Sequence, residues 1–251
     1  DAYLMQSRDG RVVFAMPFEQ RFTLIGTTDI AYTGDPAVVA ISREEEDYLI
    51  GLANQFFRQP VDRDLIVWRY AGVRPLQDDE EANPSAVSRD YKLDLVAEAG
   101  RPALLNIIGG KVTTYRKLAE AALHKLAPHL PPMGAAWTAA VPLPGGDVGT
   151  DGIEGYARDL ERHRPGLSPM VLSRLVRRYG TLCDSVLGDA RSEAGLGSDL
   201  GGGLFEREVD YLKTREWART PEDVLWRRTK TGLHLSPVEL QSTTERLSRL
   251  L

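Results

Sequence analysis

Alternating apolar residues near the start of the chain predict two short strands. Residues 11–16 (RVVFAM) and 21–27 (RFTLIGT) are rich in β-branched and aromatic side chains. Residues 17–20 (PFEQ) separate them, and this is the length of a hairpin connection. The pattern therefore predicts a β-hairpin.

A helix is predicted next, followed by three further β-rich runs. Ser42 with Glu45 three residues later is a capping-box signal. Residues 43–57 then carry apolar side chains at helical spacing until Pro60 stops the pattern. The β-rich runs cover residues 64–73, 86–96 and 103–108, separated by the polar turns QDDEEANPS and EAGRP. This mixture indicates an α+β layer with a mostly antiparallel sheet.

The last part of the chain is predicted to be all-helical. Residues 114–130 have a helical pattern, after which proline and glycine interrupt the chain in LPPMG and PLPGGDVGTDG. We place a boundary near 140–150, with domains at 1–140 and 141–251. Helix-like segments follow near 153–163, 168–188, 204–217, 221–231 and 237–251. Thr220-Pro221 and Ser236-Pro237 with Glu239 mark two of the helix starts.

Composition excludes several classes of protein. The 251 residues are 42% hydrophobic and carry a formal net charge of -5, which argues against a nucleic-acid-binding protein. No apolar run approaches the roughly 18 residues of a membrane span, and no signal peptide is evident. We therefore expect a cytoplasmic location. The single cysteine, Cys183, is expected to be a small buried hydrophobe in a reducing compartment, and no metal site is predicted.

The stretch LLNIIGGKVTTYRKLAEAAL, residues 104–123, is the first candidate for chemistry. A strand that ends at Gly109-Gly110 and opens a helix lets a ligand approach the backbone. The helix start offers unpaired N–H groups and a positive dipole end, which suit an anion. Two glycines before a helix are more often a tight turn with no ligand, and Lys111 alone does little to favour a binding site.

Two arginines are the second candidate. Arg74 lies at the end of a β-rich run, where Pro75 turns the chain. In a strand, alternate residues lie on the same face, so Arg89 is predicted to share a face with Val87, Tyr91 and Leu93. This is the face expected to be buried. An inward arginine needs a partner. That partner is either an anionic ligand or a local carboxylate, for which the acidic run 78–81 and Asp90 are candidates.

Longer motifs carry a family resemblance. FTLIGTTDIAYTGDP, IVWRYAGVRPLQDDE, SRDYKLDL, GGKVTTYRKLAE, VPLPGGD and EDVLWRRTKTGL occur in this order along the chain. Together they resemble the C-terminal part of the FAD-dependent, quinone-linked sn-glycerol-3-phosphate dehydrogenases. The resemblance covers essentially the whole chain, and it is more specific than any single motif because the long pieces recur together.

The resemblance implies a phosphate-binding set of residues. By the family pattern Arg74 and Arg89 face the substrate, where forked guanidinium donors match phosphate oxygens. Lys111 adds a point charge near flavin and substrate, and Thr27 falls where the family has a substrate-contacting threonine. A strand threonine that pairs across the hairpin is the alternative for Thr27. Arg74 is also expected to act in catalysis by orienting the substrate and stabilising developing charge.

The resemblance also gives the two glycines a role. It implies that Gly109, Gly110, Lys111, Val112 and Thr113 lie against the flavin ring of FAD and present backbone N–H groups to its pyrimidine side. Reduced flavin carries negative charge there, and a preorganised dipole stabilises that charge. The glycines would then leave room for the ring system.

One departure from the family pattern concerns the FAD pyrophosphate site. A whole enzyme of this kind begins with a strand, a G-x-G-x-x-G turn and a helix, and this chain contains no such string. We therefore expect a fragment that is inactive alone. The general base is expected in the absent part, because the histidines lie outside the motifs that resemble the substrate site: His124, His129, His163 and His234.

The implied reaction oxidises sn-glycerol 3-phosphate to dihydroxyacetone phosphate, with hydride transfer to FAD and electrons passed to quinone. Two alternatives stay open: a glycerol-3-phosphate oxidase with oxygen as acceptor, and a non-enzymatic interaction module. A homodimer and a peripheral contact on the inner face of the cell membrane are also left open. The cluster LWRRTKTG, with Arg227, Arg228 and Lys230, is either an anion or headgroup contact or a solvated helix face.

Overall fold

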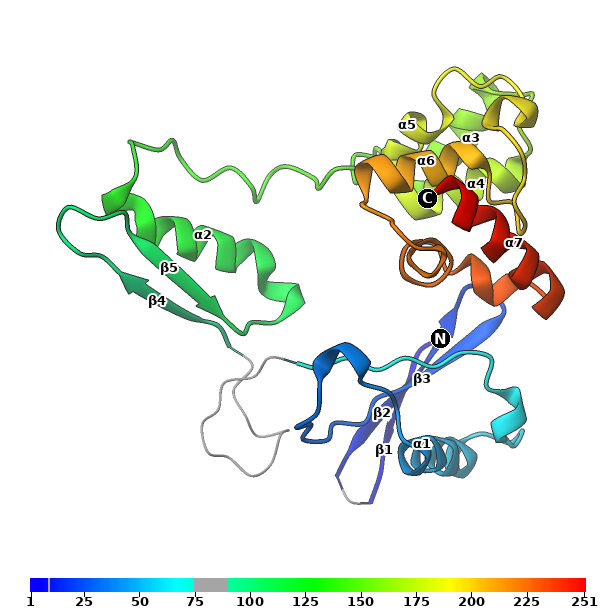
Figure 1. Cartoon of the computed structure of the whole chain (residues 1–251), viewed down its shortest axis with the longest axis horizontal. Coiled ribbons are helices and arrows are strands. Elements are labelled where there is room, and N and C mark those ends of the chain that lie inside the picture. Colours follow the sequence, from blue (N-terminus) through cyan, green and yellow to red (C-terminus); the bar gives the residue numbers. More distant parts are fainter. Residues whose placement is uncertain (9, 75–89) are drawn as a thin grey trace. The chain divides into compact units, whose positions relative to one another are not determined.

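The computed structural model describes residues 1–8, 10–74 and 90–251. The chain divides into two compact units, Asp1–Ala139 and Ala140–Leu251. Figure 1 colours them along the sequence, from blue strands at the start to red helix at the end. The family resemblance also implies that residues 1–140 are the C-terminal portion of the substrate (cap) and FAD-binding domains, and this assignment remains a prediction.

An antiparallel three-stranded sheet opens the first unit. Its strands are β1 (Tyr3–Gln6), β2 (Val12–Phe18) and β3 (Phe22–Gly26), in that order across the sheet. Phe14 pairs with Gly26 and Phe18 with Phe22, so the predicted hairpin is confirmed. Both residues at its tip, Glu19 and Gln20, have positive φ values of 45° and 63°. This left-handed geometry suits the right-handed twist of a tight hairpin.

Helix α1 (Arg43–Phe56) packs on one face of this sheet. Its predicted capping box is present, because Ser42 accepts from the Glu45 N–H while the Glu45 side chain accepts from the Ser42 N–H. The core between sheet and helix contains Met5, Val13, Ala15 and Leu52. Alternation along β1 and β2 leaves apolar residues of the other parity exposed: Leu4, Phe14 and Met16.

The run 64–73 was predicted as a strand, and this prediction is wrong. A 3₁₀ turn occupies Arg63–Leu65, and residues 66–74 form no strand. β-branched and aromatic residues favour an extended backbone, but a strand also needs a partner for its N–H and C=O groups. No such ladder is formed by residues 66–74 in the described part of the chain.

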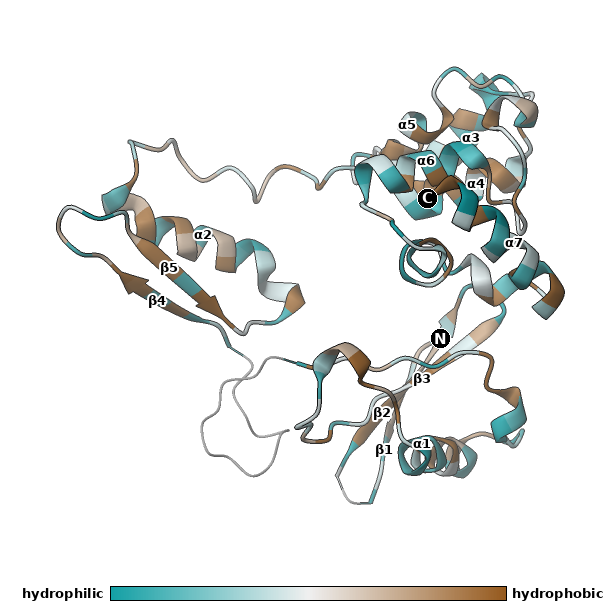
Figure 2. Cartoon of the chain, in the orientation of Figure 1, coloured by the Kyte–Doolittle hydropathy of each residue, from teal (hydrophilic) through white to brown (hydrophobic). Residues whose placement is uncertain are grey.

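A second antiparallel pair completes the first unit. β4 (Lys92–Val96) pairs with β5 (Leu104–Ile108), and helix α2 (Tyr115–Leu126) packs on the pair. Figure 2 shows hydrophobic positions on both strands and on α2. Residues 86–89 of the predicted run 86–96 lie outside the described residues. The predicted strand at 103–108 is confirmed. The strand, Gly-Gly turn and helix therefore follow one another as predicted.

The second unit is helical, as predicted. Its α-helices are α3 (Gly152–His163), α4 (Pro169–Tyr179), α5 (Cys183–Leu187), α6 (Glu206–Arg215) and α7 (Pro237–Leu250). They enclose a continuous apolar core that includes Leu172, Leu187, Leu204, Leu212 and Leu247. The buried thiol of Cys183 belongs to this core, which confirms its prediction as a buried apolar residue. The α+β class followed by a helical domain is thus confirmed.

The predicted helix at 221–231 has a different geometry. Residues Asp223–Arg228 form a π-helical turn, and a 3₁₀ turn follows at Thr231–His234. The Thr229 N–H and its hydroxyl both donate to the carbonyl of Val224, five residues earlier, at 3.1 and 2.6 Å. Hydrophobic spacing does not distinguish this wider turn from an α-helix. None of the described helices is both long and apolar enough to cross a membrane.

Candidate functional site

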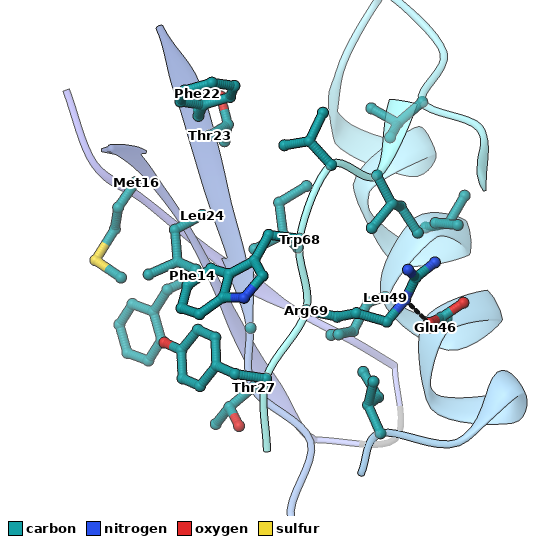
Figure 3. A pocket seen from close by; sticks show the side chains of 18 of the residues that line it. Phe14, Met16, Phe22, Thr23, Leu24, Thr27, Glu46, Leu49, Trp68 and Arg69 are labelled. Atoms are coloured by element: carbon teal, nitrogen blue, oxygen red, sulfur yellow. Dashed lines mark hydrogen bonds and ion pairs between the residues drawn. The ribbon is translucent and has the colours of Figure 1, made fainter. Parts of the chain in front are cut away.

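A hollow of 670 Å³ lies within the first unit, bordered by β3, α1 and residues 61–72. Figure 3 shows Trp68 beside the strands and the Arg69 side chain extending toward α1. Its walls are mainly apolar, and the ring of Trp68 stacks on Tyr70 with centroids 4.8 Å apart. Thr27, one of the predicted substrate residues, belongs to the wall.

A buried carboxylate ties this wall to the helix. Glu46 on α1 is only 8% exposed and forms ion pairs with Arg63 and Arg69. Burial of a carboxylate is costly unless it is paired, and here two guanidinium groups pair with it. These contacts fix residues 63–69 beside α1 even though residues 66–74 have no strand ladder.

Thr27 and Thr28 occupy the turn that leaves β3. The Thr27 hydroxyl donates to the carbonyl of Thr28 at 2.8 Å, and β3 ends at Gly26, so Thr27 does not pair across the hairpin. The hydroxyl of Thr28 donates to Oε1 of Glu45 at the start of α1. Burial raises the pKa of Glu45, but hydrogen bonds from Thr28 and Ser42 outweigh it, so the pKa lies below its ordinary value. Glu45 therefore anchors this turn as an ionised acceptor.

Arg74 forms an ion pair with Asp29, two residues after Thr27. The Arg74 side chain is 41% exposed and that of Asp29 is 24% exposed, although the contacting oxygen of Asp29, Oδ2, is itself buried. The carboxylates suggested as partners for the inward Arg89 are not tested by this contact, because Arg89 and residues 78–81 lie outside the described residues. Asp29 was missed because nothing in the local sequence of either residue signals a pairing between such distant positions.

Arg89, the other predicted phosphate ligand, lies outside the described residues. The structure therefore places Thr27, Asp29 and Arg74 in one group at the end of β3. The turn at Gly109–Thr113 is a second group.

The Gly-Gly turn after β5 has left-handed backbone geometry. The φ values are +71° at Gly109 and +103° at Gly110, which are conformations that favour glycine. A Cβ on Gly110 would lie 3.1 Å from Cδ1 of Leu118 and 3.3 Å from Cβ of Tyr91. The close packing of the turn against α2 is therefore sufficient to explain why position 110 is a glycine.

The helix start after this turn has no side-chain caps. Lys111 precedes a 3₁₀ turn at Val112–Thr114, which leads directly into α2, and neither Lys111 nor Thr114 caps with its side chain. Lys111, Val112 and Thr113 are exposed. First-turn N–H groups that lack a cap provide donors and a positive dipole end for an electron-rich group. This geometry fits the edge of a flavin ring.

The cationic cluster of the second unit is engaged internally. Arg227 pairs with Glu222 and Asp223 at 3.0 Å each. Arg228 pairs with Asp223 at 3.2 Å and donates to the Glu216 carbonyl. Lys230 donates to the carbonyl of Trp226. These contacts favour a structural role for the cluster over an anion or headgroup contact.

Comparisons with known proteins match both units. A family model described as FAD dependent oxidoreductase matches residues 2–116. A second, described as the C-terminal domain of alpha-glycerophosphate oxidase, matches residues 136–245. The two matched regions follow one another along the chain and leave few residues unmatched.

Curated relatives extend the comparison along almost the whole chain. A glycerol-3-phosphate dehydrogenase of Pseudomonas aeruginosa is 51% identical over 94% of this chain and 46% of its own length. The aerobic glycerol-3-phosphate dehydrogenase of Escherichia coli is 46% identical over 94% of this chain and 47% of its own. A D-erythritol 1-phosphate dehydrogenase of Brucella abortus is 44% identical over 98% and 49%. The chain spans about half the length of these relatives.

Proposed function

Because this chain belongs to the family of FAD-dependent glycerol-3-phosphate dehydrogenases, we propose that it supplies substrate and flavin contacts to an enzyme that oxidises sn-glycerol 3-phosphate to dihydroxyacetone phosphate. The observation that carries the proposal is the 51% identity to the Pseudomonas aeruginosa dehydrogenase along 94% of the chain. Since the chain spans about half of that relative, the fragment is proposed to be inactive alone.

The phosphate of the substrate is assigned to Arg74, Arg89 and Lys111. A phosphate monoester carries about 1.5 to 2 negative charges near neutral pH, which suits several cations. The guanidinium group has five N–H donors, and the ion pair with Asp29 engages the Nη2 side of Arg74. Thr27, in the same turn as Asp29, is proposed to contact a substrate hydroxyl. Arg74 would orient the substrate and stabilise charge that develops on it.

The flavin contact is assigned to Gly109, Gly110, Lys111, Val112 and Thr113. Their support is the exposed helix start without side-chain caps and the left-handed Gly-Gly turn. When bound, FAD would accept the hydride from C2 of the substrate. The residues of this chain would hold the ring edge through backbone N–H donors, and the exposed Lys111 would add positive charge beside it. The base that takes the hydroxyl proton is proposed to lie outside this chain.

A quinone is proposed as the electron acceptor, with a peripheral contact on the inner face of the membrane where quinones are dissolved. Relatives named dehydrogenase rather than oxidase support an acceptor other than oxygen. The description of the second family model, an alpha-glycerophosphate oxidase, keeps oxygen as the competing acceptor.

A second candidate substrate is a longer polyol phosphate. The relative from Brucella abortus, named D-erythritol 1-phosphate dehydrogenase, is 44% identical over 98% of this chain. A cationic group that binds phosphate serves both compounds, because the phosphate is common to them. Discrimination would then depend on residues that contact the additional hydroxyl-bearing carbon.

The test uses the full-length, FAD-loaded protein. Anaerobic flavin reduction would be followed with sn-glycerol 3-phosphate and with D-erythritol 1-phosphate, and reoxidation with oxygen and with a soluble quinone. We expect faster reduction by glycerol 3-phosphate and faster reoxidation by quinone. Reduction by neither polyol phosphate would overturn the proposal. Faster reduction by D-erythritol 1-phosphate would make that compound the proposed substrate. Faster reoxidation by oxygen would make oxygen the proposed electron acceptor.

A further inference from the structure

We propose that Asp29 is a positioning residue, whose carboxylate holds the guanidinium of Arg74 in the orientation that receives the substrate phosphate. The inference rests on the proposed function, because it assigns phosphate binding to Arg74. It begins from the ion pair between Nη2 of Arg74 and Oδ2 of Asp29.

Asp29 is attached to a well-fixed part of the fold. It follows β3 by three residues, and β3 is hydrogen-bonded to β2 along its whole length. The adjacent Thr28 donates to Glu45, which also closes the capping box at the start of α1. Sheet and helix thus both restrain the turn that carries Asp29.

Arg74 lacks that kind of support. Residues 66–74 are in no strand, and Arg74 borders the segment 75–89, which lies outside the described residues. An arginine side chain loses much rotamer freedom when it is ordered. The ion pair with Asp29 restricts the side chain before the substrate arrives, so less entropy is lost when phosphate binds.

The geometry of the contact also leaves a phosphate-binding edge. Arginine binds phosphate through two parallel N–H donors, and the contact between Nη2 of Arg74 and Oδ2 of Asp29 draws the guanidinium toward the turn after β3. Nη2 carries two N–H bonds and belongs to both bidentate edges of a guanidinium, one shared with Nε and one with Nη1, so one edge can face Asp29 while the other binds phosphate.

The experiment is a double-mutant cycle in the full-length, FAD-loaded enzyme. Asp29→Asn keeps the size of the side chain and removes its charge, and Arg74→Gln removes the guanidinium. We expect Asp29→Asn to raise KM for glycerol 3-phosphate about tenfold with a much smaller change in kcat, since it weakens phosphate binding. In the Arg74→Gln background the same substitution is expected to have almost no further effect.

A binding readout accompanies the kinetics. Inorganic phosphate serves as a competitive probe of the cationic site, and its inhibition constant is expected to rise with KM in Asp29→Asn. Asp35→Asn is the matched control, because Asp35 is exposed and caps only the short turn at Pro36–Val38. Asp29→Glu retains the charge and is expected to recover part of the affinity.

The outcomes separate the two proposals. A wild-type enzyme that does not oxidise either polyol phosphate would overturn the proposed function itself. An active wild type with unchanged KM in Asp29→Asn, or with a lower KM, would overturn only the positioning role. A full additional loss in the Arg74→Gln background would show that Asp29 acts independently of Arg74. If Asp29→Asn does not fold, Asp29→Glu is measured instead: its longer side chain displaces the carboxylate, so KM and the inhibition constant of phosphate are expected to rise together, and unchanged values of both would overturn the positioning role.

Discussion

Glu208 and Arg178 form a buried ion pair in which Nη1 of Arg178 donates to Oε1 of Glu208 at 2.6 Å. Glu208 is 1% exposed, and it also accepts from Arg174 at 2.8 Å and from the Tyr179 hydroxyl at 2.9 Å. Burial, together with the Glu208 carboxylate, raises the pKa of Tyr179 far above its ordinary value, so its hydroxyl stays a donor. Helices α4 and α6 are thereby joined through one carboxylate.

Glu208→Gln tests this connection. The substitution keeps the shape of the side chain but leaves two largely buried guanidinium groups without their negative partner. Breaking a buried pair on one side costs about 3–5 kcal/mol. We expect a decrease of that size in the free energy of unfolding of the second unit, measured by urea denaturation.

Asp210→Asn is the control for Glu208→Gln, since it removes a carboxylate from an exposed position of the same helix. Exposed substitutions of this kind change stability by about 0.5 kcal/mol or less. Equal effects of the two variants would contradict a special role for the Glu208 network.

Asp223 gives a pH-dependent prediction. Its Oδ2 accepts from the N–H groups of Arg219 and Thr220 at 3.0 Å each, and these bonds, led by that from Arg219, lower its pKa from 3.8 to about 2. The folded state therefore releases this proton more readily than the unfolded state. The stabilisation is complete above pH 4 and is lost as the pH falls toward 2.

Asp223→Asn retains an acceptor oxygen but does not titrate. We expect its unfolding free energy to depend less on pH between 2 and 5 than that of the wild type. Asp223→Ala removes the acceptor of the Arg219 and Thr220 N–H groups, which acts as a helix-start cap does, and should lower stability near neutral pH by about 0.5–2 kcal/mol. Parallel pH profiles for wild type and Asp223→Asn would show that the carboxylate is not linked to folding.

The reactivity of the Cys183 thiol measures unfolding of the second unit. It is 0% exposed, and burial, with the nearby Asp184 carboxylate, raises its pKa from 9.0 to about 12. The thiolate is the reactive form, so a native thiol of this kind reacts slowly at pH 8. We expect a disulfide reagent to label Cys183 only on unfolding, at a rate that urea increases. Ser248→Cys, at an exposed position of α7, supplies the rapid reference. Labelling of native Cys183 at that reference rate would be inconsistent with the buried thiol.

Sequence patterns predicted the elements whose determinants are local. The capping boxes at Ser42 and Ser236 and the hairpin of β2 and β3 involve residues only a few positions apart, and all three are present. The strand predicted at 64–73 depended on a partner strand, which local sequence does not specify. The π-helical turn at 223–228 depended on a threonine hydroxyl bond that hydrophobic spacing does not reveal.

The candidate site was predictable only in part. Thr27, Arg74 and the Gly109–Thr113 turn were predicted because long motifs resembled a family, and their roles in binding remain predictions. Asp29 was missed as the partner of Arg74, since ion pairs between distant positions follow from the fold rather than from spacing. Glu208 lies in the charged run FEREVD, a pattern typical of an exposed helix face, and its burial depends on arginines from another helix.

The two units differ in the extent of their cores, and this gives the last prediction. The main cluster of the second unit includes Leu172, Leu187, Leu212 and Leu225 within a continuous set of buried residues, whereas the sheet of the first unit buries Met5, Val13, Ala15 and Leu52. Exposed apolar residues remain in the first unit: Leu4, Phe14, Val96, Leu104 and Ile108. Burial of apolar area is the main stabilising contribution to folding.

Residues 140–251 should therefore fold as an isolated domain with a single cooperative transition, followed by circular dichroism during heating. Residues 1–139 alone should unfold with little cooperativity and bind a dye that reports exposed apolar surface. Leu212→Ala removes a fully buried side chain from α6 and should lower the stability of the isolated second unit by about 2–5 kcal/mol. A cooperative transition in the isolated first unit, with no dye binding, would contradict this prediction. It would show that the small core of the first unit is enough for that unit to fold alone.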